Sequence, residues 1–232
     1  MINKKALNSS IKNFHGNHPF DHCVIDNFLK EDVLEHIIEE FPHYDAEEWL
    51  AYNNPLEDKK TSNVWHLMPK YTYSLFQYLN SHDFTEYLSD LVGEKLYADY
   101  GLHGGGLHCH SDGGNLNPHM DYSIHPKINL QRFLNIIIYV SPEMKEEFGG
   151  HLGLWEHDEK NMQPGKLATE VFPKCNRAIL FNTTQNSWHG MSRELSLPKE
   201  IFRSSLAIYY LREPDKNAVK RGKALFAPRK EQ

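Results

Sequence analysis

The sequence predicts an α+β fold with a mainly β core, in which a jelly-roll barrel is packed by helices from the N-terminal part of the chain. Two observations support this prediction. Residues 1–103 contain amphipathic runs with helical spacing, whereas residues 104–212 contain short apolar or alternating runs separated by Gly, Pro and Asn. The chain therefore divides into a helical and mixed supporting region at 1–103, a β core at 104–212 and a basic C-terminal tail at 213–232.

The supporting region contains one strand-like segment and three expected helices. Residues 20–28 (F-D-H-C-V-I-D-N-F) have the apolar character of a strand. Residues 31–41 place their apolar side chains on one helical face before a proline ends the helix. Pro69 is expected to begin a second helix, and a third is expected to be capped by Ser81 and ended by Gly93.

The β core contains eight short runs, which is the strand number of a jelly roll. These runs are Gly106–His110, Leu116–Tyr122, Phe133–Val140, His151–Glu156, Leu167–Phe172, Ala178–Phe181, Trp188–Met191 and Phe202–Leu211. Residues 213–232 that follow hold six Lys and Arg against three Asp and Glu. We expect this tail to be solvated or loosely docked.

Composition excludes several classes of protein. The chain of 232 residues is 40% hydrophobic and carries a formal charge of −6, so it has no general attraction to nucleic acid. The longest apolar run, residues 136–140, is far shorter than the roughly 20 residues of a membrane-spanning helix. Three scattered cysteines, Cys23, Cys109 and Cys175, are too few for a disulfide framework, and they favour a reducing, cytoplasmic compartment.

Histidine is abundant, with 15 residues, and this points to metal or acid–base chemistry. Four His-x-acid pairs occur, against about two expected by chance from composition. Only His119 and Asp121 lie in a plausible strand, which would send both side chains to one face. His189 can supply a third ligand, because a jelly roll brings its seventh strand beside its second. Two histidines and one carboxylate form the facial triad of non-haem Fe(II) oxygenases.

An arginine begins the last predicted strand, R-S-S-L-A-I-Y-Y-L. Arg203 and Ser205 share one face of this strand. A buried guanidinium is costly unless an anion pairs with it, and its planar fork suits a carboxylate. We therefore expect Arg203 to anchor the far carboxylate of a dicarboxylate whose 2-oxo acid end binds the metal. Arg193 is the competitor for this role, and its place beside Glu194 in a polar loop counts against it.

These motifs resemble the prolyl 4-hydroxylase-like branch of the 2-oxoglutarate/Fe(II)-dependent dioxygenases. The resemblance rests on G-G-N-L-N-P-H-M-D, R-F-L-N-I-I-I-Y-V, F-G-G-H-L-G-L-W, S-W-H-G and R-S-S-L-A in this order. It implies a double-stranded β-helix core in which His119, Asp121 and His189 bind Fe(II) and Arg203 binds 2-oxoglutarate. Tyr139 is the match for a further 2-oxoglutarate contact in relatives, and Asn135 is a second candidate.

The resemblance also implies a reaction. O₂ and 2-oxoglutarate are cosubstrates, succinate and CO₂ are coproducts, and a substrate C–H bond is hydroxylated. The substrate is either a small molecule or a peptidyl proline, and the oligomeric state is not readable from the sequence. Residues 123–132 after the metal motif are a candidate lid or substrate contact.

Three alternatives remain open. One is a cupin-like metalloenzyme that uses no oxo acid, and another is a jelly-roll module that binds carbohydrate and holds a non-catalytic metal. The third is a separate metal cluster in G-L-H-G-G-G-L-H-C-H, although strand alternation would place His108 and His110 on one face and Cys109 on the other.

Overall fold

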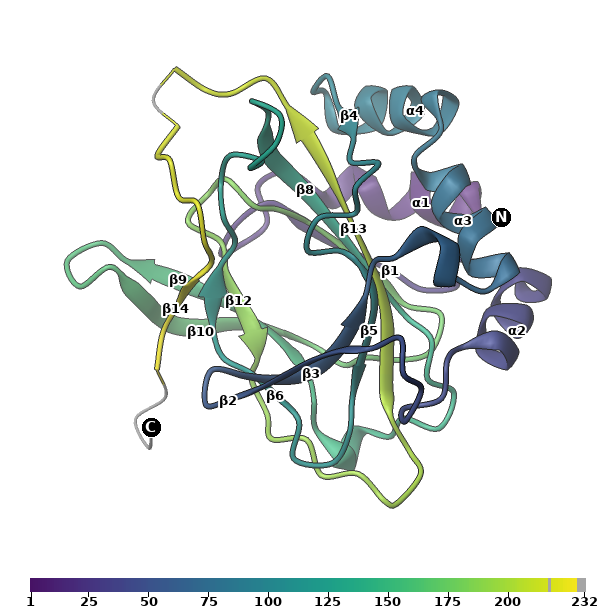
Figure 1. Cartoon of the computed structure of the whole chain (residues 1–232). Coiled ribbons are helices and arrows are strands. Elements are labelled where there is room, and N and C mark those ends of the chain that lie inside the picture. The colour runs from purple at the N-terminus through teal and green to yellow at the C-terminus, as the bar shows by residue number, and fades with distance from the viewer. Residues whose placement is uncertain (217, 229–232) are drawn as a thin grey trace.

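The computed structural model describes residues 1–216 and 218–228 and shows two antiparallel sheets that face each other, with helices on one side (Figure 1). The helices are α1 (Lys4–Ser10), α2 (Glu31–Glu40), α3 (Lys70–Leu79) and α4 (His82–Val92), with 3-10 turns at Ile11–Asn13, Trp65–Leu67 and Glu146–Phe148. The strands are β1 (His22–Ile25), β2 (Leu50–Asn54), β3 (Glu57–Ser62), β4 (Tyr97–Ala98), β5 (Gly106–His110), β6 (Asn115–Leu116), β7 (His119–Met120), β8 (Gln131–Tyr139), β9 (Leu152–Asp158), β10 (Gln163–Val171), β11 (Ala178–Asn182), β12 (Trp188–Met191), β13 (Arg203–Arg212) and β14 (Leu225–Phe226).

The larger sheet has the strand order β1-β11-β8-β13-β5-β3-β2, and the smaller has the order β10-β9-β12-β7-β14. Strands β8, β11 and β13 read as nearly continuous apolar runs because both faces of the larger sheet are covered. One face packs on the helices and the other faces the smaller sheet. This arrangement is the predicted α+β jelly roll with packing helices.

The helices pack one apolar face against the larger sheet. Leu75, Phe76 and Leu79 of α3 belong to the same buried cluster as Ile136 of β8 and Ile208 of β13. Burial of such side chains stabilises the fold by about 1.5–3 kcal/mol each relative to exposure. The helices therefore hold the larger sheet rigid behind the interior that the two sheets enclose.

The expected helix ends are confirmed. The Ser81 side chain accepts a hydrogen bond from the backbone N–H of Phe84, which caps α4, and Gly93 ends α4 with a φ of 71°. Pro69 precedes the first residue of α3. No helix among residues 1–216 and 218–228 is long and apolar enough to cross a bilayer.

Two parts of the sequence prediction need correction. The expected strand Leu116–Tyr122 is divided into β6 and β7, and Asp121 lies just after β7 rather than within a strand. The tail is not loosely docked over its described part, because β14 pairs with β7 in the smaller sheet. Residues 217 and 229–232 of that tail lie outside the described residues.

The supporting region also contributes more strands than expected. The hairpin of β2 and β3 was not predicted, and it extends the larger sheet beyond β5. Strand β3 is polar and strand β2 is mostly exposed, so the hairpin lacks the alternation of buried apolar and polar residues by which a strand is recognised. The three-part division at residues 103 and 212 stays a prediction.

Candidate metal centre and active-site pocket

Two histidines meet across a pair of strands in the smaller sheet. His119 of β7 and His189 of β12 are direct register partners. Side chains opposite each other in a strand pair stand on the same face, and the two imidazole rings lie 4.3 Å apart between centroids. The expected return of the His189 strand beside the His119 strand is therefore confirmed, although the two histidines are 70 positions apart in the sequence.

Backbone carbonyls fix the orientation of both rings. The Nδ1 atom of His119 donates to the carbonyl of Asn117 at 3.0 Å, and the Nδ1 atom of His189 donates to the carbonyl of Ser187 at 2.9 Å. These bonds leave each Nε2 atom as a lone-pair donor toward the interior. Burial lowers the pKa of His119 to about 3 and lowers that of His189 as well, so both rings are neutral near pH 7. Neutral imidazoles are the form that binds a metal.

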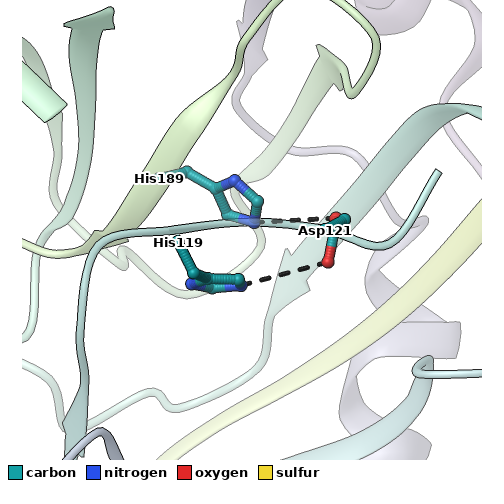
Figure 2. A group of neighbouring side chains, drawn as sticks. All are labelled: His119, Asp121 and His189. Atoms are coloured by element: carbon teal, nitrogen blue, oxygen red, sulfur yellow. Dashed lines mark ion pairs between the residues drawn. The ribbon is translucent and has the colours of Figure 1, made fainter. Parts of the chain in front are cut away.

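Asp121 completes the group (Figure 2). Its Oδ1 lies 3.9 Å from His119 Nε2, and its Oδ2 lies 3.8 Å from His189 Nε2. The three ligand atoms lie within 4.8 Å of one another, and all three residues are buried. Oδ2 is buried and has no hydrogen-bond partner among the described residues. An unpartnered carboxylate oxygen beside two imidazole lone pairs is the donor set that Fe(II) prefers, so the residues fit this ion.

A buried arginine that the sequence analysis missed holds the carboxylate. Arg132, at the start of β8, approaches Asp121 Oδ1 through Nη1 at 3.1 Å. Its guanidinium lies between the rings of Tyr122 and Tyr209, 3.7 Å and 3.4 Å from their centroids. Burial raises the pKa of Asp121, but Arg132 and the two histidines outweigh burial and hold that pKa below its ordinary value. Asp121 is therefore ionised.

One feature of the sequence indicates that Arg132 is buried and paired. Arg132 opens R-F-L-N-I-I-I-Y-V, an otherwise apolar run in which a charge demands a partner. The sequence prediction places Arg132 at the end of the candidate lid at 123–132, whose role as a lid stays a prediction.

Arg203 lies at the start of β13 and is 5% exposed. Its Nε donates to the carbonyl of Gly150 at 2.8 Å, and its Nη2 lies 3.5 Å from the Tyr139 hydroxyl. No carboxylate of the described residues forms an ion pair with it, and burial lowers the pKa of Arg203. A buried guanidinium without an anion is an incomplete arrangement that an anionic ligand would complete. Arg193, the competitor, is instead paired with Glu170 at 2.8 Å on the surface.

Two glycines of F-G-G-H make room for this arginine. Gly149 and Gly150 have φ angles of 74° and 67°, a region that L residues rarely adopt. A Cβ atom on Gly150 would lie 3.0 Å from Cδ of Arg203. The motif therefore fixes the turn and leaves the space through which the Arg203 side chain passes.

A cavity of about 340 Å³ joins the histidine–aspartate group to Arg203. Asn135 and Ser205 line it as predicted, and Asn135 Oδ1 is buried without a partner among the described residues. Tyr139 is not among the lining residues, but its hydroxyl lies 3.5 Å from Nη2 of Arg203. The structure thus brings the predicted site residues other than Tyr139 to one cavity, and the roles of all of them as ligands stay a prediction.

His108 and His110 of β5 also line this cavity. Their strand neighbour Cys109 faces the other way, where its thiol lies 3.7 Å from the Ser204 hydroxyl. Within the described residues the three do not form a metal-binding group. Burial lowers the pKa of His108 to about 3 and lowers that of His110 well below its ordinary value, so both rings are neutral. They are polar walls of the cavity.

Comparison with known proteins identifies similar sequences. Residues 105–211 match the model of the 2OG-Fe(II) oxygenase superfamily. The chain is 26% identical over 200 residues to prolyl 3-hydroxylase OGFOD1 of Mus musculus, which covers 83% of this chain and 33% of that protein. It is 28% identical over 192 residues to the Xenopus laevis protein of the same name, covering 77% of this chain and 32% of that one. The chain thus spans about a third of the length of these curated relatives.

Solved structures share the fold. A prolyl 4-hydroxylase of Pseudomonas putida superposes with a TM-score of 0.60 at 14% identity, covering 90% of this chain and 100% of that one. A prolyl hydroxylase of Trichoplax adhaerens, in complex with a hypoxia inducible factor peptide, gives 0.61 at 15% identity over 89% and 90%. HygX of Streptomyces hygroscopicus, with nickel, 2-oxoglutarate and hygromycin B bound, gives 0.55 at 13% identity over 91% and 88%.

The matched segment extends from β5 to β13 and contains both histidines, the aspartate and Arg203. The sequence match, the shared fold and the donor set of two histidines and one carboxylate all point to the same class of protein. Residues 105–211 of this chain are therefore similar to the 2OG-Fe(II) oxygenase superfamily in sequence, and the chain shares the fold of solved prolyl hydroxylases.

Proposed function

We propose that this chain is an Fe(II)- and 2-oxoglutarate-dependent hydroxylase whose substrate is a prolyl residue of a protein or peptide. One observation carries the proposal. A buried group of two neutral imidazoles and an unpaired carboxylate oxygen shares a cavity with a buried arginine that no carboxylate of the described chain neutralises. A cation site and an anion site in one cavity suit a metal ion and an oxo dicarboxylate together.

Each residue has a role in this proposal. His119 Nε2, His189 Nε2 and an oxygen of Asp121 would hold Fe(II), and Arg132 would keep Asp121 ionised and fixed. Arg203, with the Tyr139 hydroxyl and Ser205, would bind the distal carboxylate of 2-oxoglutarate, and Asn135 would contact the same molecule. When bound, the iron with 2-oxoglutarate and O₂ supplies the oxidation of a substrate C–H bond, with succinate and CO₂ as coproducts.

The remaining residues of the cavity exclude water and orient the reactants. The imidazoles are held by backbone carbonyls and Arg132 by two aromatic rings, so the ligands need little reorganisation when the ion binds. Leu152, Ile137 and Met191 give the cavity apolar walls. Such walls keep an oxidising centre away from water.

The substrate class rests on the relatives. The two curated relatives are prolyl 3-hydroxylases, and two structural neighbours are prolyl hydroxylases, one of them with a peptide. A small molecule is the second candidate, because HygX shares the fold and was crystallised with hygromycin B. The cytoplasm remains the proposed location, and the free thiols of Cys23, Cys109 and Cys175 support it.

The test is succinate formation from 2-oxoglutarate by the purified chain with Fe(II), O₂ and a panel of proline-containing peptides. We expect turnover that needs Fe(II) and is lost in His119→Ala and in Arg203→Met, with Arg193→Met as the matched control that keeps it. Iron-dependent activity that survives Arg203→Met would favour a cupin-like enzyme instead. Tight glycan binding without any 2-oxoglutarate turnover would favour a carbohydrate-binding module.

A further inference from the structure

The C-terminal segment 219–227 runs along the edge of the smaller sheet, beside the strand β7 that carries His119. We name this segment the strap. In Figure 1 it is the yellow chain that descends on the left of the view, and its strand β14 pairs with β7. Phe226 is the register partner of His119, and Leu225 is the partner of Met120. Without the strap, the two-residue strand β7 would form the edge of this sheet.

Ala227 of the strap binds residues 117–118, which directly precede the proposed metal ligand His119. The backbone N–H of Ala227 donates to the carbonyl of Pro118 at 2.8 Å. The carbonyl of Ala227 accepts from the side-chain amide of Asn117 at 3.1 Å. Asn117 is also the residue whose carbonyl orients the His119 ring. The strap therefore holds Asn117 in place, and the Asn117 carbonyl in turn orients the His119 imidazole.

Arg221 of the strap binds the backbone of the proposed ligand Asp121 and of Ser123, which follows it. The Nε of Arg221 donates to the carbonyl of Asp121 at 2.6 Å, and burial lowers the pKa of this arginine. Two further backbone bonds of 2.8 Å join Arg221 to Ser123: its N–H donates to the Ser123 hydroxyl, and its carbonyl accepts from the Ser123 N–H. These bonds matter because Asp121 lies outside any strand and lacks a ladder of its own.

The third contact is a ring stack. The Phe226 ring lies 4.9 Å from the His119 ring between centroids, at an interplanar angle of 23°. His189 lies on the other side of the same imidazole, 4.3 Å away. Phe226 therefore closes the face of His119 that the sheet leaves open, and it lines the cavity with Ala224.

From these contacts we propose that the strap sets the geometry of the metal centre, with Phe226 and Arg221 as positioning residues for His119 and Asp121. The proposal rests on the proposed function, since it presumes that these side chains bind a divalent metal. Residues that orient metal ligands typically change metal affinity 10- to 100-fold when they are removed. We expect a change of about tenfold for each of the two strap residues.

The experiment is a titration of the metal-free full chain with Co(II), followed by visible absorption, which reports both affinity and ligand geometry. We expect Phe226→Ala and Arg221→Met each to weaken Co(II) binding about tenfold and to change the spectrum. Phe226→Tyr, which keeps the ring stack, is expected to restore both. Leu225→Ala is the matched control, because Leu225 is the neighbour in β14, is 39% exposed and has no part in the stack.

The outcomes separate the two proposals. Binding and spectra in Phe226→Ala and Arg221→Met that equal those of Leu225→Ala would overturn the strap proposal. If Phe226→Ala does not fold, Arg221→Met decides by the same comparison. A wild-type chain that binds no Co(II) would overturn the proposed function, and the strap proposal with it.

Discussion

Arg203 gives the sharpest test of the site, because its replacement by Met should have opposite effects on ligand binding and on stability. Arg203 is 5% exposed, and its guanidinium donates to the Gly150 carbonyl at 2.8 Å and lies 3.5 Å from the Tyr139 hydroxyl. It has no ion pair with any described carboxylate. In the metal-free, ligand-free chain it is a buried charge whose desolvation is uncompensated. Met has a similar length and no charge.

The magnitudes follow from burial. Loss of a buried charge-assisted contact with a carboxylate costs about 2–5 kcal/mol, and 3 kcal/mol is roughly a hundredfold in affinity. We therefore expect Arg203→Met to weaken 2-oxoglutarate binding about a hundredfold. The free energy of unfolding of the metal-free chain should stay equal or rise by about 1 kcal/mol, because an apolar side chain replaces an unpaired buried ion.

Two measurements check this prediction. Anaerobic titration of the Fe(II)-loaded chain with 2-oxoglutarate gives the affinity, and urea denaturation in the presence of a chelator gives the stability. Arg193→Met, whose guanidinium is on the surface beside Glu170, is the control that should leave 2-oxoglutarate binding unchanged. Unchanged affinity in Arg203→Met, or a loss of several kcal/mol of stability in the metal-free state, would refute the reasoning.

Three other perturbations test neighbouring parts of the site. Arg132→Met leaves Asp121 buried without its cation, so urea denaturation of the metal-free chain should give a free energy of unfolding about 3 kcal/mol lower. Saturating metal should restore part of this loss. Equal losses with and without metal would contradict the prediction. Gly150→Ala places a Cβ 3.0 Å from Arg203 Cδ at a φ of 67°, so we expect 2-oxoglutarate binding to weaken about tenfold while Co(II) binding stays unchanged in the same titrations. His110 is neutral in the folded chain because burial lowers its pKa, so below the ordinary histidine pKa of about 6.5 the unfolded chain binds more protons than the folded chain. The free energy of unfolding of the metal-free chain should therefore fall as the pH drops from about 6.5. In urea denaturation, His110→Gln should reduce this slope by on the order of 1 kcal/mol per pH unit.

The fold was predictable where burial imposes a period. The run 133–140 is apolar at nearly every position because β8 is covered on both faces, and it extends over Gln131–Tyr139 in the structure. The end of α4 was predictable because Ser81 and Gly93 satisfy backbone groups locally. The β2–β3 hairpin was not predictable, since β2 is mostly exposed and the polar strand β3 gains its partner, β5, from a distant part of the chain.

The candidate metal-binding residues of the site were predictable, but the residues that position them were not. His119, Asp121 and His189 could be chosen because residue type and strand order together restrict which histidines meet. Arg132 and Phe226 could not be assigned, because their roles depend on a cross-strand approach and on a tail that composition describes only as basic. A charge inside an apolar run was the available sign for Arg132, and no comparable sign marks Phe226.

The two buried arginines of the cavity explain why one protein can hold a dication and a dianion side by side. Arg132 is neutralised by Asp121, so the cation-binding end has no net charge from this pair and its imidazoles are neutral. Arg203 is not neutralised, so the other end carries one positive charge in a low-dielectric interior. An ion such as Fe(II) that binds alone would add two positive charges and strengthen the field that attracts a carboxylate. An oxo dicarboxylate that binds alone would meet Arg203, because the other described cations of the cavity, Lys59 and Arg132, are paired with Glu57 and Asp121. Because a free-energy coupling between two ligands acts equally in both directions, the same charges that make the anion depend on the metal also make the anion hold the metal in place.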